Sequence, residues 1–179
     1  MTHEDPSTPI AWPIALAGAA VLGTLATACM MPLVGIATLA AATMNRAQAV
    51  TAVIGVWAAN QLLGFGLLGY PLDGYALTWG GALGTAGVAA LFVARRIVGR
   101  GPVALGRLAL AFVAAFAAYE VLLFAFALVA GGTDTFTPAI VLRILANDAA
   151  WLAGLAILYR LLTRAAPRLF GAAPALRLS

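Results

Sequence analysis

The sequence predicts an all-α integral membrane protein, built as a bundle of six transmembrane helices in a single domain spanning residues 1–179. Of these residues, 64% are hydrophobic and only 9% are charged, whereas about a quarter of a soluble domain is charged. Four apolar segments are each about as long as the roughly 20 residues that a helix needs to cross a bilayer core. Most of the arginines lie between these segments or at their ends.

The four clear spans cover residues 47–69, 77–94, 108–130 and 138–160. Residues 12–44 are harder to divide, because 33 apolar residues are too many for one upright helix and few for two. Pro32 would break or kink a helix at that point. We therefore expect two shorter spans, 12–29 and 33–44, and six in total. One long kinked helix, giving five spans, is the alternative.

The arginines orient the bundle. Four lie in the 95–107 loop, and four more lie at or after the end of the last span. The only charged residues of the opposite loops are Asp73 and Asp134. The positive-inside rule places the arginine-rich loop and the C-terminal tail, 161–179, in the cytoplasm. Six spans also place the N-terminal tail, 1–11, inside. That tail is acidic, which favours five spans. It also lacks the basic start of a signal peptide, so we expect the tail to be retained. We expect a multi-pass protein of the inner (cytoplasmic) membrane.

Polar side chains recur at one depth on three predicted spans. At about 1.5 Å per residue, Asn60 and Glu120 lie roughly 20 and 18 Å from the cytoplasmic ends of their helices. Asn147 lies roughly 15 Å from the outer end of the last span. Intramembrane polar and ionisable groups usually face the bundle interior and mark a pathway or a binding site. We therefore predict a ligand site formed by Asn60, Gln61, Glu120, Asn147 and Asp148.

Aromatic residues accompany these polar groups. Trp57, Asn60 and Gln61 share one face of a helix by their i, i+3, i+4 spacing. Trp151 lies one turn beyond the polar pair of the last span, and Tyr119 precedes the acid of the fifth. We expect Trp57, Tyr119 and Trp151 to stack on the ligand, and Arg143 to balance the acids or to meet an anionic group. The alternative is that the polar groups only join helices by hydrogen bonds.

Cys29 is the only cysteine, and Met30 and Met31 follow it. Thiolate and thioether groups are soft metal ligands, but Cys and Met are also ordinary apolar residues in membrane helices. The only histidine, His3, lies in the tail. We therefore expect no dedicated metal site, although in the six-span arrangement Cys29 would lie at the outer mouth, where it could touch a ligand.

Small residues form two stripes. Ala15, Ala19 and Gly23 recur every four positions on the first span, and Gly80 and Gly84 do so on the fourth. Such stripes let helix backbones approach closely, within the chain or against a partner. Trp12 and Trp79 lie near span ends, where tryptophan commonly marks the membrane interface.

No motif in the chain indicates catalysis, energy conversion or nucleic-acid binding. A nucleophile elbow, a Walker-type glycine-rich loop and a histidine-based catalytic set are absent from the sequence. The arginines are spread over several segments and form no basic patch of the kind that binds nucleic acid. We expect a non-enzyme without a cofactor. A membrane enzyme that used Glu120 and Asp148 as an acid–base pair is the least favoured alternative.

The length, the six spans, the cytoplasmic ends and the polar pocket in the outer half together resemble the substrate-binding S component of energy-coupling-factor transporters. The resemblance covers the whole chain, but only in architecture. Ala15-x-x-x-Ala19 matches the stripe with which that family docks on a transmembrane coupling subunit. The resemblance implies a site beneath the outer loops, here 29–32, 70–75 and 131–137. It also implies a coupling subunit with ATPases as partners, and Cys29 is reminiscent of the cysteine that some cobalamin-specific members direct toward cobalt.

With this resemblance, we expect a membrane-embedded subunit that binds a small, vitamin-like micronutrient, such as cobalamin, for an uptake transporter. The alternative is a non-catalytic assembly or structural protein, whose polar residues only lock helices together.

Overall fold

Helices follow one another along the part of the chain that the computed structural model describes, which is residues 10–26, 31–99, 101–170 and 176–177. The four longest are α3 (Arg46–Gly66), α4 (Gly74–Val98), α5 (Leu105–Ala130) and α6 (Pro138–Ala165). Each is long and apolar enough to cross a membrane. These helices make the chain an all-α, multi-pass membrane protein, as its composition predicts.

Polar residues at the turns determine where three of these helices begin. The side chains of Asn45, Asp73 and Thr137 each accept a hydrogen bond from the backbone N–H three residues later, at 2.9, 2.8 and 3.3 Å. Such N-caps satisfy donors that the first turn of a helix leaves unpaired. The starts of α3, α4 and α6 therefore lie within three residues of the predicted ones.

The segment 12–44 forms two helices, α1 (Ala11–Ala26) and α2 (Leu33–Thr43), and the second differs from the span predicted at 33–44. With 11 residues, α2 is roughly 16 Å long, about half of the hydrocarbon core. Ten of its residues are buried, and it packs against all of α1, α3, α4, α5 and α6. It is thus a short core helix and not a lipid-facing span.

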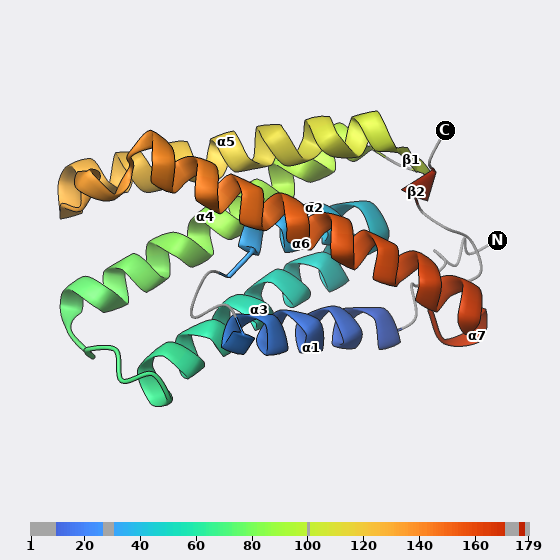
Figure 1. Ribbon diagram of the computed structural model, residues 1–179, viewed down its shortest axis with the longest axis horizontal. Coiled ribbons are helices and arrows are strands. Elements are labelled where there is room, and N and C mark those ends of the chain that lie inside the picture. Colours follow the sequence, from blue (N-terminus) through green and yellow to red (C-terminus); the bar gives the residue numbers. More distant parts are fainter. Residues whose placement is uncertain (1–9, 27–30, 100, 171–175, 178–179) are drawn as a thin grey trace.

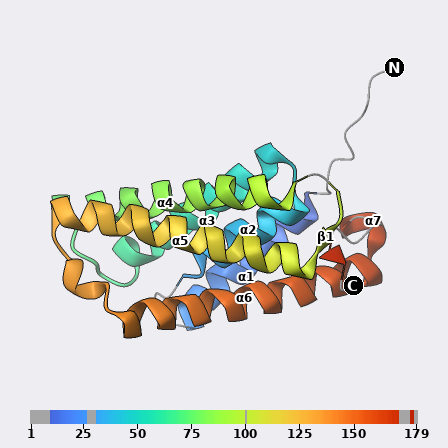
Figure 2. The same ribbon diagram turned by 90° about the horizontal axis from the view of Figure 1, so that it is seen from above.

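The bundle is elongated, and its helices run roughly along the long axis (Figure 1). Helices α4 and α5 lie side by side, and the view turned by 90° shows α2 in the middle of the bundle (Figure 2). The largest fully buried side chains include Ile36 and Leu39 of α2, Val53 of α3 and Leu91 of α4. The core therefore surrounds α2.

Trp12 ties the start of α1 to one end of the bundle. Its side chain is fully buried, its indole Nε1 donates to the Thr43 hydroxyl at 2.9 Å, and its ring lies 4.7 Å from that of Tyr159. The interfacial position predicted for Trp12 is therefore wrong, because the amphipathic ring serves equally well in a core that offers its N–H an acceptor.

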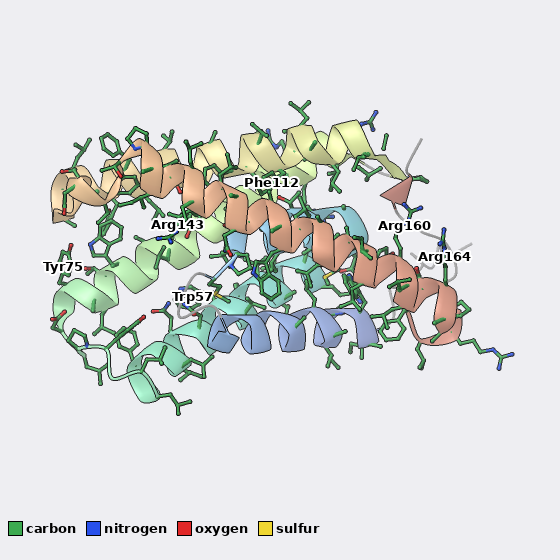
Figure 3. All side chains as sticks on the ribbon, in the orientation of Figure 1. Trp57, Tyr75, Phe112, Arg143, Arg160 and Arg164 are labelled. Atoms are coloured by element: carbon green, nitrogen blue, oxygen red, sulfur yellow. The ribbon has the colours of Figure 1, made fainter. Side chains whose placement is uncertain are left out.

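Arginines gather at the same end. Arg95 Nη1 donates to the carbonyl of Met44 at 3.0 Å, and the Arg46 guanidinium lies 5.3 Å from the ring centroid of Phe92. Figure 3 shows Arg160 and Arg164 at the opposite end of the molecule from Tyr75. We call these ends the arginine end and the loop end. Between α3 and α4, and between α5 and α6, the loop end carries Asp73 and Asp134.

Parts of the predicted tail 161–179 and of the predicted loop 95–107 form helix or strand. Helix α6 continues to Ala165, and α7 (Pro167–Phe170) follows it. Strand β2 (Leu176–Arg177) pairs in parallel with β1 (Val103–Ala104), with Val103 opposite Leu176. A 3-10 turn, η1 (Thr133–Thr135), lies in the connection from α5 to α6. The C-terminal segment thus closes onto the arginine end.

Candidate functional site

A cavity of about 280 Å³, which we call the inner cavity, lies between α3, α4, α5, α6 and the residues that begin α2. Its wall combines aromatic rings, aliphatic side chains, three amides and one carboxylate. The lining residues are Met31, Leu33, Trp57, Asn60, Gln61, Trp79, Leu83, Tyr119, Glu120, Leu123, Thr135, Phe136, Ile140, Ile144 and Asn147.

A second hollow, of about 520 Å³, adjoins the inner cavity toward the loop end, and we call it the outer hollow. The exposed residues Tyr70 and Pro71 of the α3–α4 connection and Tyr75 at the start of α4 line it. Asn60, Gln61, Trp79, Leu83 and Thr135 line both spaces. The amide pair therefore stands where a molecule would pass from the loop end to the inner cavity.

The structure brings six of the predicted site residues to one space. Trp57, Asn60 and Gln61 come from α3, Tyr119 and Glu120 from α5, and Asn147 from α6. The predicted depths depend only on helical rise, and all three helices are regular over these positions. That these residues hold a ligand remains a prediction.

The side-chain amides of Asn60 and Gln61 line the inner cavity without a hydrogen bond to a described residue of a neighbouring helix. Both residues are half-buried, and within the described chain neither amide makes a hydrogen bond to another group. The Gln61 amide oxygen packs tightly against the position where Gly80 lacks a side chain. Interhelical hydrogen bonds thus do not explain this polar pair.

Glu120 is the one charged residue among those that line the inner cavity. It is half-buried and close enough to Tyr119 and Asp148 to interact with both electrostatically. No basic side chain forms an ion pair with it in the described residues. The cavity therefore contains an acidic group to which the described residues supply no counter-ion.

Asp148 has a different position from Glu120, although both acids lie at similar depth. Only 2% of Asp148 is exposed, and its Oδ1 accepts a hydrogen bond from the Gly35 backbone N–H at 2.7 Å. Gly35 lies in the first turn of α2, whose N–H groups have no partner within the helix. Asp148 thus caps α2 from a different helix and does not line the cavity.

Glycines on α4 position Trp57 and Gln61. The Trp57 Nε1 donates to the Gly80 carbonyl at 2.8 Å, and a Cβ on Gly84 would lie 2.7 Å from the Trp57 ring. The predicted Gly80-x-x-x-Gly84 stripe is thus an internal contact, at which α3 side chains lie against α4. Trp57 therefore forms a fixed wall of the cavity.

Two further predicted site residues, Arg143 and Trp151, do not line the inner cavity. Arg143 is exposed, and Figure 3 shows it on the part of α6 nearer to Tyr75 than to Arg160. Trp151 lines a separate groove of about 580 Å³ between α1 and α6, together with Ala19 and Asn147. Cys29 lies outside the described residues.

The predicted docking stripe packs partly within the protein. Ala15 and Ala19 of α1 are half-buried and lie against the core. Gly23 follows on the same helix, beyond the part of α1 whose surroundings are described. Ala19 also lines the groove that contains Gly154 and Trp151. Docking of this face on a partner stays a prediction.

Trp79 and Phe136 were missed by the sequence reasoning, which assigned Trp79 to the membrane interface. Trp79 lines both spaces, packs edge-on against Phe126 at 5.0 Å, and has a buried Nε1 without a hydrogen-bond partner in the described residues. Phe136 reaches the cavity from the α5–α6 connection. The i+4 spacing of Trp79 and Leu83 beside the glycine stripe was the signal that could have placed Trp79 inside.

Within the described residues, no three His, Cys, Asp or Glu side chains lie close enough together to hold a metal ion. The geometry instead suits the binding of a small organic molecule, for which apolar and aromatic walls with a few convergent polar groups are typical. Comparison with known proteins identifies no relative: no protein-family model, no curated protein and no solved structure matches this chain.

Proposed function

We propose that this protein is the membrane-embedded, small-molecule-binding subunit of an uptake transporter. The observation that carries the proposal is the inner cavity, where Asn60, Gln61 and Glu120 have no hydrogen-bonding partners in the described chain and face the same space as Trp57 and Trp79. Polar groups are retained at membrane depth against a high desolvation cost when they serve a site or a pathway.

The proposed topology has six passages with both ends in the cytoplasm, and the second passage includes the short, buried helix α2. Helix α1 begins at the arginine end, because Trp12 contacts Thr43 and Tyr159, and α2 returns to that end. The positive-inside rule then places the arginine end in the cytoplasm and the two hollows on the outer side. In a bacterium this membrane would be the inner one.

The proposed ligand is smaller than cobalamin. A volume of about 280 Å³ is slightly below the roughly 300–1,000 Å³ that is common for small-molecule pockets. A corrin with its nucleotide tail would need the inner cavity and the outer hollow joined, and contact with Cys29 as well. A compact vitamin-like molecule fits the inner cavity without such a change.

The proposed partner is a transmembrane coupling subunit with ATPases. The chain carries no phosphate-binding motif of its own, so energy for uptake would come from another protein. Ala15, Ala19 and Gly23, together with the α6 side of the groove, form the proposed docking face. The arginine end adds positive charge that the same assembly could use.

Mass spectrometry of small molecules retained by the purified protein tests the proposal. We expect one compound to be retained by the unmodified protein and by Asp134→Asn, an exposed acid outside both hollows, but lost from the nearly isosteric Glu120→Gln. Equal retention of the compound by both variants would exclude the binding site. The site would also be excluded if no compound were retained by the protein and cells with Glu120→Gln showed no uptake defect.

A second candidate function, a structural or assembly factor, is favoured by two contacts. Asp148 to Gly35 and Trp57 to Gly80 are interhelical hydrogen bonds of the kind that lock a bundle. This candidate predicts loss of a partner complex when Asp148 is changed, with no saturable binding of any small molecule. The cavity-facing amides have no role in it.

A further inference from the structure

We infer that the ligand of the inner cavity is a small organic cation, held by the Glu120 carboxylate within walls of aromatic rings. The inference rests on the proposed function, and it specifies the chemical class that the cavity selects. Three observations on charge, on the start of α2 and on the rings lead to it.

The first observation concerns charge. Glu120 lines the cavity, and no described arginine does so, because these residues gather at the arginine end except for Arg143, which is exposed on α6. Asp148 lies near Glu120 but does not line the cavity. A carboxylate left unpaired at membrane depth is costly, so a bound cation would supply the missing counter-charge.

The second observation removes the main source of anion affinity. The N-terminus of α2 lies beside the cavity, since Met31 and Leu33 line it, and a helix N-terminus ordinarily attracts anions. Here the carboxyl group of Asp148 already accepts from the Gly35 N–H at 2.7 Å. The N–H groups of Leu33 and Ile36 donate to the carbonyls of Met31 and Pro32 at 2.9 and 3.0 Å, and Val34 also donates to Asp148. The positive end of the helix is therefore occupied by the protein itself, and an anionic ligand would find no free N–H group there.

The third observation concerns the rings. Trp57, Trp79, Tyr119 and Phe136 line the cavity from three helices and one loop. Ring faces attract organic cations, tryptophan most strongly, and cages of such rings are a common means of recognising ammonium groups. The hydrogen bond of Trp57 to Gly80 and the contact of Trp79 with Phe126 hold two of the rings before any ligand arrives.

The amides complete the chemistry. Asn60 and Gln61 of α3 both line the cavity and can orient a hydroxyl or amino group at the uncharged end of the ligand. A ligand with one cationic centre, a body of few atoms and one polar substituent satisfies all of these groups within about 280 Å³.

Binding of matched probes to the full-length protein in detergent tests the inference. The cations are choline and benzyltrimethylammonium, the uncharged control is dimethylbutanol, which has the shape of choline, and the anionic control is benzoate. Trp57 and Trp79 line the cavity, so tryptophan fluorescence provides the readout. We expect saturable quenching by the cations, and affinity for them to fall roughly tenfold or more in Glu120→Gln. Asp134→Asn should bind them unchanged.

The possible failures are distinguishable. Dimethylbutanol binding as tightly as choline, or benzoate binding saturably, would overturn the cation assignment but leave a small-molecule-binding function standing. Unchanged cation affinity in Glu120→Gln would overturn the role of the carboxylate. If no probe bound saturably, the assignment of the ligand as a cation would also be overturned. If the same preparation also retained no small molecule, the proposed function would fall as well.

Discussion

The Oδ1 atom of Asp148 on α6 accepts a hydrogen bond from the backbone N–H of Gly35 at 2.7 Å, near the start of the short helix α2. The two backbones nearly touch here, since a Cβ on Gly35 would lie 2.6 Å from the Asp148 carbonyl oxygen. A helix that begins inside a membrane has no water near its first N–H groups. These groups therefore need a hydrogen-bond acceptor from elsewhere in the protein. Asp148 provides that partner.

Replacing Asp148 should therefore destabilise the fold more than replacing an exposed cap of the same kind. Asp148→Ala leaves a buried N–H unpaired, and we expect a loss of about 1–3 kcal/mol of stability. Asp73→Ala removes the bond to the Ala76 N–H on α4, where water can replace it, and should cost about 1 kcal/mol or less. Thermal unfolding of both variants in the same detergent measures the difference. An equal change in Tm would contradict the capping role.

Glu120 should behave in the opposite way. Because its carboxylate makes no hydrogen bond with the described residues, removing the charge takes away a desolvation cost without breaking a bond. We expect Glu120→Gln to keep or raise the Tm while ligand binding falls, as is common for residues kept for function. A clear drop in Tm for this variant would indicate a structural role for Glu120 instead.

The glycines of α4 give a graded prediction. Gly84→Ala would place a Cβ 2.7 Å from the Trp57 ring, which the 2.8 Å hydrogen bond to the Gly80 carbonyl holds in place. Overpacking of this kind typically costs about 1–3 kcal/mol. Gly80→Ala would meet the movable end of the Gln61 side chain and should cost less. Gly81→Ala meets nothing within 4 Å and should be neutral or stabilising.

The order of these three unfolding temperatures is the measurement. If Gly80→Ala proved more damaging than Gly84→Ala, the Gln61 amide would be fixed and not free to face the cavity.

Helix positions could be read from the sequence because two local signals agree there. A long apolar stretch requires an internally hydrogen-bonded helix in lipid, and cap residues such as Asn45, Asp73 and Thr137 mark where it begins. The short length of α2 could not be read in this way. Residues 33–44 are as apolar as a span, and only the surrounding helices reveal that they are buried on every side.

The sequence could predict the level of the site residues along their helices, but not the direction in which each side chain points. Glu120, Asn147 and Asp148 lie at one level because helical rise is constant. Asn147 and Asp148 are neighbours and point about 100° apart on the helix, so the packing of α6 against α2 decides that Asn147 lines the cavity while Asp148 is buried. Trp12 and Trp79 show the same ambiguity, since tryptophan is suited to an interface and to a core alike.

Cysteine accessibility tests the six-span topology. In a chain with Cys29 replaced by alanine, cysteines at position 5 and at exposed Gly101 should label only from the cytoplasmic side, and a cysteine at Asp134 only from outside. Labelling of position 5 from outside, together with Gly101 from inside, would show that α1 and α2 make a single crossing. The cavity would keep its outward orientation in either case.

The groove between α1 and α6 provides the sharpest test of the proposed partner. Ala19 and Gly154 line it, and a Cβ on Gly154 would meet nothing within 4 Å, so a larger side chain there fills the groove without disturbing the fold. If a helix of the coupling subunit lies in this groove, Gly154→Leu should block its close approach. Ligand binding should then persist at its normal affinity while uptake is lost.

The control is Gly18→Leu, which adds the same side chain to an exposed position of α1 that does not line the groove and also meets nothing within 4 Å. It should leave uptake intact. The double variant Ala15→Leu, Ala19→Leu should lose uptake as Gly154→Leu does, but with a lower Tm, because both alanines also pack against the core. Normal uptake by Gly154→Leu would mean that no partner helix enters the groove. The alanine stripe would then serve only the internal packing of α1.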